Sequence, residues 1–292
     1  MKQVTQIILA LCVVVFQPHT GRAQKPGNWT LGLTFQPCYY WKYNKADWNN
    51  RPNSYPVSPR KFNGWASGIT ASYAFSDRLG IGTEFTFSRQ EQDFNVMVLS
   101  HTGTDGKISY VYAHDDYTRL SYLKLPVYAT VNMEIGYESG LFLKLFAGPQ
   151  LSYLTNYRSE FRQHDFDHQT FAVLPDVITN TQILTPSAAF QDFVNFDGSH
   201  SVNSWKTPYL YQHFELGVLA GIVLEKRLFN RYIFSVGTRY ELGITNSENP
   251  NVNRDTLVFG GFGGSNNGAS PGPATHNRRF VLNLGFAYIL GR

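Results

Sequence analysis

Seven ionisable residues recur within short apolar segments and are the first candidates for chemistry. Each alternates with Leu, Val, Phe or Ile: Glu84, Lys124, Lys144, Glu215, Glu225, Arg239 and Glu241. Carboxylates that face lysine and arginine at close range form either an acid–base site or a set of ion pairs. Arg239 and Glu241 are two positions apart and therefore share one face of a strand. This spacing favours a ladder of ion pairs over a reaction.

Other side chains with catalytic or metal-binding chemistry lie apart from these segments. His164-Asp165-Phe166-Asp167-His168 contains histidine and aspartate but no ligand set that defines a zinc site. A serine hydrolase needs Ser, His and Asp in one pocket, and His213 stands at the start of an expected strand. Gly260–Gly268 lacks the Lys-Ser/Thr that follows the glycines of a phosphate-binding loop. We therefore expect no catalytic, metal-binding or cofactor-binding residue and no cofactor.

The elements that must position the charged residues are strands. Alternation of apolar and polar residues with period two dominates the chain, and no stretch keeps a helical period. The pattern predicts an all-β protein with eight strands, at 29–41, 65–75, 79–91, 119–133, 141–156, 212–226, 231–246 and 278–290. Pro126 and Pro149 fall inside two of these strands, where the missing N–H predicts β-bulges.

The connections between these strands alternate in length. The long ones are 42–64, 92–118, 157–211 and 247–277, and the short ones are 76–78, 134–140 and 227–230. Short periplasmic turns and long outer loops are typical of outer-membrane barrels, and an even strand number places both termini in the periplasm. Phe94–Ser100 and Lys107–Ala113 flank a segment suited to a hairpin turn, so the third and fourth strands are expected to extend well above the bilayer. Thr170–Leu184 is rich in β-branched residues and has the character of a further hairpin, so ten strands remain an alternative to eight.

The composition bears on which face of the sheet meets water. Charged residues make up 16% and aromatic residues 15% of the chain, against about 25% charged in an average soluble domain. The net charge of +4 gives no basis for nucleic-acid binding. The charged face fits a narrow barrel interior better than a soluble exterior. Large rings near the strand ends match the interfacial girdles of a membrane barrel: Trp29, Trp41, Trp65, Phe75, Tyr153, Tyr232 and Tyr288.

The first 23 residues have the pattern of a secretory signal peptide. Ile7–Phe16 is apolar but shorter than the roughly 20 residues that span a bilayer as a helix. Residues 24–292 are then one β-barrel domain. Cys38 is its one cysteine, so no intramolecular disulfide forms. We expect an antiparallel transmembrane β-barrel with long extracellular loops in the outer membrane.

Four segments carry a family resemblance: 119–126, 146–154, 215–222 and 239–246. They resemble the outer-membrane β-barrel family of Bacteroidota, which includes the PorT-like proteins, and the likeness covers the chain apart from its loops. The resemblance implies a fold and a location more than an activity, although one branch serves the type IX secretion machinery. Outer-membrane barrels usually end on an aromatic residue that the insertion machinery recognises. In this chain the last aromatic residue, Tyr288, is followed by four further residues.

The expected function is a structural or interaction role, carried by large surface loops on a barrel with a filled polar lumen and linked to secretion machinery. One alternative is an outer-membrane hydrolase or lipid-modifying enzyme with its site at the extracellular rim. A small pore and a soluble ligand-binding calyx are the others. The expected partners are outer-membrane lipid and lipopolysaccharide, the barrel-insertion machinery and an envelope or secretion protein, but no nucleic acid.

Overall fold

The computed structural model describes residues 27–44, 58–101, 108–135, 140–167, 172–186, 189–194, 200–205, 210–229, 231–249 and 275–290. These ranges contain strands and no helix. The strands are β1 (Trp29–Asn44), β2 (Ser58–Ala74), β3 (Leu79–His101), β4 (Ile108–Glu134), β5 (Leu141–Asp167), β6 (Ala172–Leu184), β7 (Ala189–Val194), β8 (His200–Trp205), β9 (Phe214–Leu228), β10 (Tyr232–Gly243) and β11 (Thr275–Leu290). The predicted all-β class is confirmed. A helix with the length and apolarity to cross a membrane is not found within these ranges. The predicted signal peptide lies outside them.

Eight of the strands close into a ring. Their order is β1–β2–β3–β4–β5–β9–β10–β11, and β11 returns to β1 with Trp29 opposite Leu290. Each neighbouring pair is antiparallel. Every strand of the ring contains one of the eight predicted segments or most of it. The closed antiparallel barrel of eight strands is therefore confirmed.

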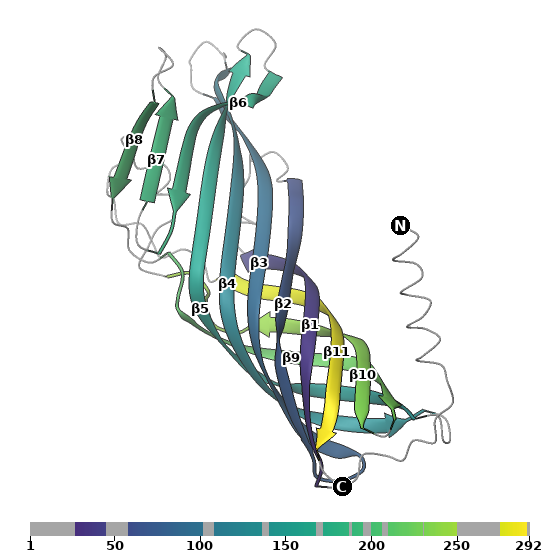
Figure 1. Ribbon diagram of the computed structural model, residues 1–292. Coiled ribbons are helices and arrows are strands. Elements are labelled where there is room, and N and C mark those ends of the chain that lie inside the picture. The colour runs from purple at the N-terminus through teal and green to yellow at the C-terminus, as the bar shows by residue number, and fades with distance from the viewer. Residues whose placement is uncertain are drawn as a thin grey trace.

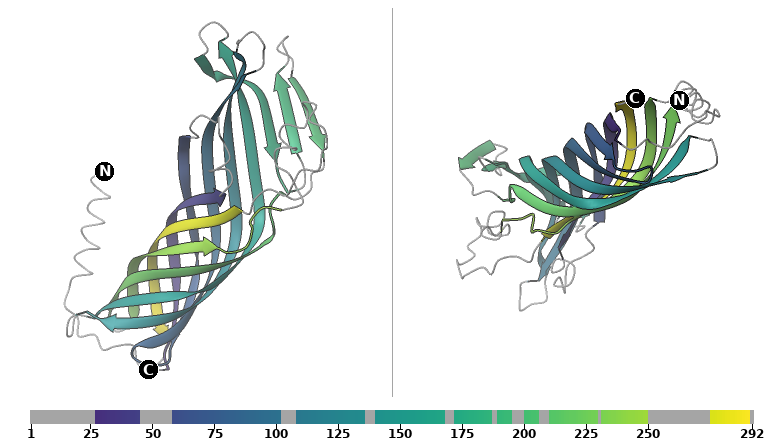
Figure 2. Two further views of the ribbon diagram at one scale, coloured as in Figure 1. Left: turned by 180° about the vertical axis from the view of Figure 1, so that it is seen from behind. Right: turned by 90° about the horizontal axis from the view of Figure 1, so that it is seen from below.

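The expected extension of the third and fourth strands is confirmed, whereas the expectation of a loop from residue 157 is wrong for the upper part of β5, which continues to Asp167. β3, β4 and β5 continue far beyond the ends of the other ring strands (Figures 1 and 2). β3 and β4 stay paired up to His101 and Ile108. β6 pairs with the upper part of β5, and β7 and β8 follow it outward. The strands beyond eight thus extend a sheet outside the ring and do not widen the barrel.

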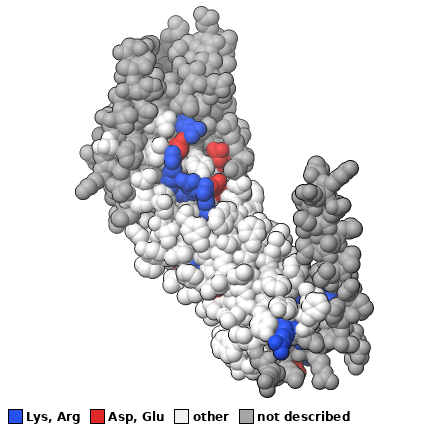
Figure 3. All heavy atoms as spheres, viewed as in Figure 1, with Lys and Arg blue, Asp and Glu red and all other residues white. Residues whose placement is uncertain are grey.

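The apolar face of the ring points outward. Leu33 is 65% exposed, whereas Gln36 on the opposite face of β1 is fully buried. The same division holds on β9, where Leu216 is exposed and Glu215 is buried. On the face of the molecule shown in Figure 3, a broad belt is almost free of charged atoms. The soluble calyx is therefore excluded, because it would need the apolar face inside.

The two prolines interrupt the hydrogen-bond ladder without forming bulges. β4 pairs with β5 in one continuous register on both sides of Pro126 and Pro149, so the predicted bulges are wrong. The Thr83 hydroxyl donates to the Pro126 carbonyl at 2.8 Å and adds a side-chain hydrogen bond between β3 and β4 at this point. The register shift between these strands lies instead at Ser121 and Tyr122.

The short turns gather at one rim of the barrel. Backbone hydrogen bonds tie them together there: Asn132 N–H donates to Arg78 O, Arg227 N–H to Gly140 O, and Ile289 N–H to Arg231 O. β1 begins and β11 ends at this same rim. The extended sheet and the strand ends that the long connections join are at the opposite rim. This arrangement is the one expected of an outer-membrane barrel, with the short turns toward the periplasm.

Candidate functional site: the barrel lumen

Arg239 of β10 lies at the centre of the lumen and is almost fully buried. Its Nη1 contacts Glu84 Oε2 of β3 at 2.8 Å, its Nη2 donates to Gln36 Oε1 of β1 at 2.6 Å, and its Nε donates to Glu241 Oε1 at 2.9 Å. Gln36 completes the triangle because its Nε2 donates to Glu84 at 2.8 Å. One guanidinium thus joins three strands that are not all adjacent in the ring.

Glu241 connects this group to two further cations. Its Oε2 contacts Lys124 Nζ of β4 at 2.8 Å and Arg279 Nη1 of β11 at 2.9 Å. Three cationic side chains therefore share one buried carboxylate. In a low-dielectric interior such contacts are strong, and removing one partner leaves uncompensated charge. We call Gln36, Glu84, Lys124, Arg239, Glu241 and Arg279 the central network.

Tyr128 of β4 packs beneath the central network and needs a glycine opposite it. Its hydroxyl donates to Glu84 Oε1 at 3.1 Å, and its ring lies 5.1 Å from that of Phe146. Gly82 is directly opposite Tyr128 across the β3–β4 pair. A Cβ on Gly82 would lie 2.4 Å from the Tyr128 ring, which is closer than van der Waals contact allows. Gly82 therefore provides the room that the ring occupies.

Replacing Gly82 with valine is expected to destabilise the barrel. The new side chain must displace the Tyr128 ring and its bond to Glu84, a kind of overpacking that costs about 1–3 kcal/mol. Urea unfolding in lipid vesicles, followed by tryptophan fluorescence, measures the loss. Ala129→Val is the control, because Ala129 is exposed on the outer face and gains an equally branched side chain there. Equal stability of the two variants would contradict this account of Gly82.

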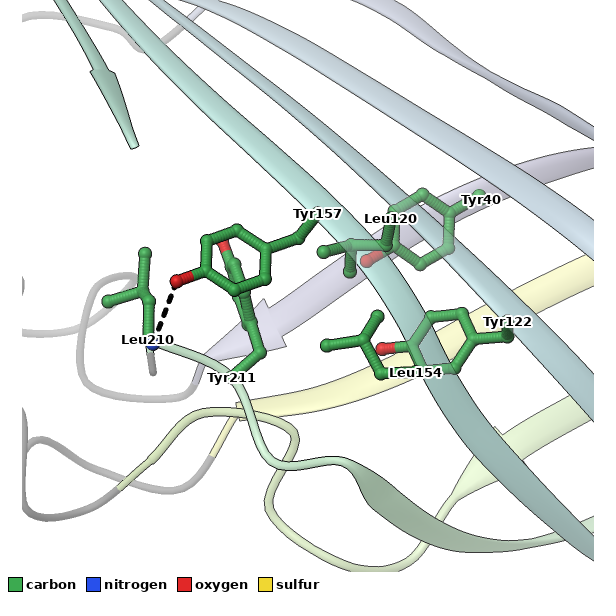
Figure 4. Packing of buried hydrophobic residues seen from close by; sticks show 7 residues of the cluster. All are labelled: Tyr40, Leu120, Tyr122, Leu154, Tyr157, Leu210 and Tyr211. Atoms are coloured by element: carbon green, nitrogen blue, oxygen red, sulfur yellow. Dashed lines mark hydrogen bonds between the residues drawn. The ribbon is translucent and has the colours of Figure 1, made fainter. Parts of the chain in front are cut away.

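A cluster of tyrosine and leucine closes the end of the lumen opposite the short turns. Its members are all buried: Tyr40, Leu120, Tyr122, Leu154, Tyr157, Leu210 and Tyr211 (Figure 4). Leu210 and Tyr211 come from the segment before β9 and lie across the opening, where the Tyr157 hydroxyl accepts from Leu210 N–H at 3.2 Å. We call this cluster the tyrosine plug.

The tyrosine plug is hydrogen-bonded to the polar lumen beneath it. The Tyr40 hydroxyl donates to Asn277 Oδ1 at 2.8 Å, and Asn277 Nδ2 donates to Tyr122 Oη at 3.1 Å and to Glu215. Glu215 is buried at this level. Apolar packing and hydrogen bonds thus seal the same cross-section of the barrel.

The half of the lumen nearer the short turns is less completely filled. A cavity of about 80 Å³ lies there, and its walls are mixed, with Thr34, Glu84 and Asn283 beside Phe146 and Val223. Lys144 and Glu225 form an ion pair at its side. The cavity ends at Glu84 of the central network. The described lumen therefore holds a small pocket with mixed polar and apolar walls on one side of a packed barrier.

The seven charged residues predicted for the barrel interior all lie there, and six of them make the ion pairs described above. The two carboxylates of the central network are each held by hydrogen bonds and cations. A general acid or base must instead exchange a proton with a substrate within reach. The geometry therefore fits a role of these charged residues in balancing each other's charge and filling the lumen. Within the described ranges, no three His, Cys, Asp or Glu side chains gather so as to hold a metal ion.

The described rings among those predicted as girdles lie on the outer surface at both ends of the ring strands. Trp29, Phe75 and Tyr232 are exposed toward the short-turn rim, and Tyr232 contacts the Tyr288 ring at 5.4 Å. Trp65 and Tyr153 are exposed toward the other rim. The side chain of Trp41 lies outside the described part of the structure.

Other sequence candidates lie away from the lumen. The His213 ring is half-buried and lies 6.1 Å from the Tyr153 ring. His164–Asp167 ends β5, but the side chains of this segment and all of His168 are outside the description, as is Gly260–Gly268.

Sequence reasoning did not single out several residues that complete the lumen. Gln36, Tyr128 and Gln150 lie on the polar faces of predicted strands, so the alternation that selected the charged residues could have selected them too. Gln150 Nε2 lies 3.5 Å from Glu241 Oε2. Asn277 precedes the predicted strand 278–290 by one residue and shares the face of Arg279. A search for buried amides as well as charges would have found these residues.

A family model and solved structures of other proteins are similar to this chain. A family model described as outer membrane protein beta-barrel domain matches residues 57–249. No curated protein sequence matches the chain. Among solved structures, OprG from Pseudomonas aeruginosa is 11% identical with a TM-score of 0.43, covering 94% of this chain and 100% of its own. The outer membrane protease OmpT from Escherichia coli is 10% identical with a TM-score of 0.43, covering 91% and 97% respectively.

The attachment invasion locus protein Ail of Yersinia pestis is similar at 8% identity and a TM-score of 0.31, covering 91% of this chain and 99% of its own. The family match covers more than half of the chain and includes ring strands from β2 to β10. It agrees with the closed ring and the uncharged outer belt. The chain belongs to the outer membrane protein beta-barrel domain family and is an outer-membrane protein.

Proposed function

We propose that this protein is a closed membrane anchor that presents an extracellular β-sheet to a partner macromolecule. The observation that carries the proposal is the continuation of β3, β4 and β5 past the barrel, where β6, β7 and β8 widen them into one sheet (Figure 1). A barrel that only filled space in the membrane would have no use for strands of up to 27 residues.

The closed lumen argues for an anchor over a pore. The central network and the tyrosine plug lie across the barrel at two successive levels, and both are buried. An eight-stranded barrel is just wide enough for side chains to fill. Solute passage would require both levels to rearrange together.

Planar-bilayer recordings test the anchor against the pore. We expect the purified, folded protein to give no stable conductance. As the comparison, a variant that loses the central network through Lys124→Ser, Arg239→Ser and Glu241→Ser, and the tyrosine plug through Tyr122→Ser and Tyr211→Ser, should conduct if it folds. A large, stable conductance of the wild-type protein would contradict the proposal.

The resemblance to PorT-like proteins supports a finer proposal, in which the partner is a component of a secretion machinery. A chain without 172–205 lacks β6, β7 and β8 but keeps the barrel strands and the tyrosine plug. In the native host, this variant should insert normally yet lose export of cargo proteins. Normal export by the shortened chain would contradict the secretion link, and the bilayer result would still decide between anchor and pore.

A further inference from the structure

Four arginines lie on the outer surface of the sheet, just beyond the girdle at the extracellular rim. They come from the adjacent strands β3, β4 and β5 and are called the arginine band: Arg89, Arg119, Arg158 and Arg162. Arg89 is directly opposite Trp65 of the girdle. Basic and acidic side chains gather where the uncharged belt ends (Figure 3). The band therefore begins at the height where the membrane ends.

An irregularity in β5 turns two of these arginines outward. Tyr122 is opposite Leu154, but Ser121 is opposite Asn156, so β5 has one extra residue at this point. Side chains that follow such a residue change faces. Leu154 is buried, whereas the side chains of Arg158 and Arg162 are 41% and 49% exposed. The bulge thus places guanidinium groups on the surface at the level of the membrane boundary.

Acidic neighbours orient the outer members of the band. Glu160 contacts Arg162 and, at 3.0 Å, Arg158. Arg89 contacts Glu91 at 2.6 Å, and this hydrogen bond raises the pKa of Arg89. With Asp93, three carboxylates lie on this face beside four guanidinium groups, so the described side chains here carry one net positive charge.

The centre of the band brings like charges together. Arg119 is directly opposite Arg158 on one side and Glu91 on the other. Like charges in directly opposite positions destabilise a sheet. An anion bound between Arg119 and Arg158 would remove that cost. A phosphate group fits this position, because a guanidinium binds phosphate oxygens through two parallel hydrogen bonds.

We propose that the arginine band binds the phosphate groups of lipopolysaccharide in the outer leaflet. Aromatic girdles mark the boundary between hydrocarbon and polar head groups. Arg119 lies two residues beyond the level of Arg89, which is about 7 Å along a strand. Burial and then the charge of Glu91 raise the pKa of Tyr117, so its hydroxyl stays protonated beside the site. This binding site is independent of the partner proposed for the extracellular sheet.

Titration of the folded protein in detergent micelles with lipopolysaccharide tests the site. Arg119→Gln combined with Arg158→Gln should weaken binding about 30-fold, since each basic residue at a membrane surface contributes about fivefold. Arg231→Gln is the control, because Arg231 is exposed at the opposite rim, where its Nη1 donates to the Tyr288 hydroxyl at 3.1 Å. The proposal would be overturned if the double variant kept the wild-type affinity for lipopolysaccharide. It would also be overturned if the Arg231→Gln control lost as much affinity as the double variant.

Further ligands identify the anion that is recognised. Dephosphorylated lipopolysaccharide should bind the wild-type protein about as weakly as lipopolysaccharide binds the double variant. Binding of inorganic phosphate or of phosphatidylglycerol vesicles as tight as that of lipopolysaccharide would overturn the assignment. Glu91→Gln removes an acidic neighbour and should tighten lipopolysaccharide binding about fivefold. Glu91→Gln keeps all four arginines, so it tests the binding site even if the double variant fails to fold. If Glu91→Gln bound lipopolysaccharide as tightly as the wild-type protein or less tightly, the site would be contradicted.

Discussion

Glu241→Ala is expected to destabilise the folded barrel by about 3–5 kcal/mol, because it removes one partner from a buried set of charges. Glu241 is the carboxylate shared by Lys124, Arg239 and Arg279, so its loss leaves three cations close together in the lumen. Urea unfolding in lipid vesicles, monitored by tryptophan fluorescence, measures the change in the free energy of unfolding. Glu134→Ala is the matched control, because Glu134 is exposed at the end of β4.

A second substitution separates charge imbalance from simple loss of packing. Lys124→Met alone should also destabilise the barrel, but Lys124→Met combined with Glu241→Ala should cost less than the two single losses added together. The difference is the coupling energy between the two side chains. Strictly additive losses, or an effect of Glu241→Ala no larger than that of Glu134→Ala, would show that the central network does not hold the ring together.

Ala220→Arg is expected to destabilise the barrel by about 2–4 kcal/mol, the cost of a basic side chain at the lipid midplane of a membrane barrel. Ala220 lies near the middle of β9 and is exposed on the outer face, opposite Ala147 of β5 and Tyr240 of β10. The free energy of unfolding in lipid vesicles is again the quantity measured.

Ala220→Leu is the control for size at the same position. Leucine adds apolar area toward lipid and should leave the stability unchanged or increase it. If arginine were tolerated as well as leucine, the outer face of β9 would not meet acyl chains, and the membrane orientation of the barrel would be wrong.

Most of the ring could be predicted because every strand of a membrane barrel must have one apolar face toward lipid and one polar face toward the lumen. Leu31 and Leu33 must meet lipid, while Thr34 and Gln36 must meet other side chains. A shift of one residue would reverse both environments at once, so the alternation is strict within the membrane. The charged residues of the lumen could be found by the same rule.

The extended sheet was harder to predict, because both of its faces can meet water beyond the girdle. There, no lipid enforces apolar residues on one face, and alternation weakens. The extra residue of β5 near Asn156 also reverses the pattern, so that Tyr157 is buried and Arg158 is exposed. A loop was therefore expected where the chain forms the upper part of β5.

The tyrosine plug was also missed, for a different reason. Leu210 and Tyr211 belong to no strand and reach the lumen only through the fold of a long connection. Their backbone pairs with the segment after β10, where Gln212 N–H donates to Ser247 O at 3.0 Å. Contacts of this kind depend on the closed ring and leave no periodic signal in the sequence.

The pairing of β1 with β11 has a consequence for how the chain is assembled. The first and last strands form the seam of the cylinder, and Thr34 Oγ1 donates to a carbonyl 250 residues away, at Leu284. Until β11 has been synthesised, β1 and β10 each present a row of unpaired backbone groups. A chain that ends before β11 therefore exposes two adhesive edges, so closure of the cylinder depends on the pairing of β11 with both β1 and β10.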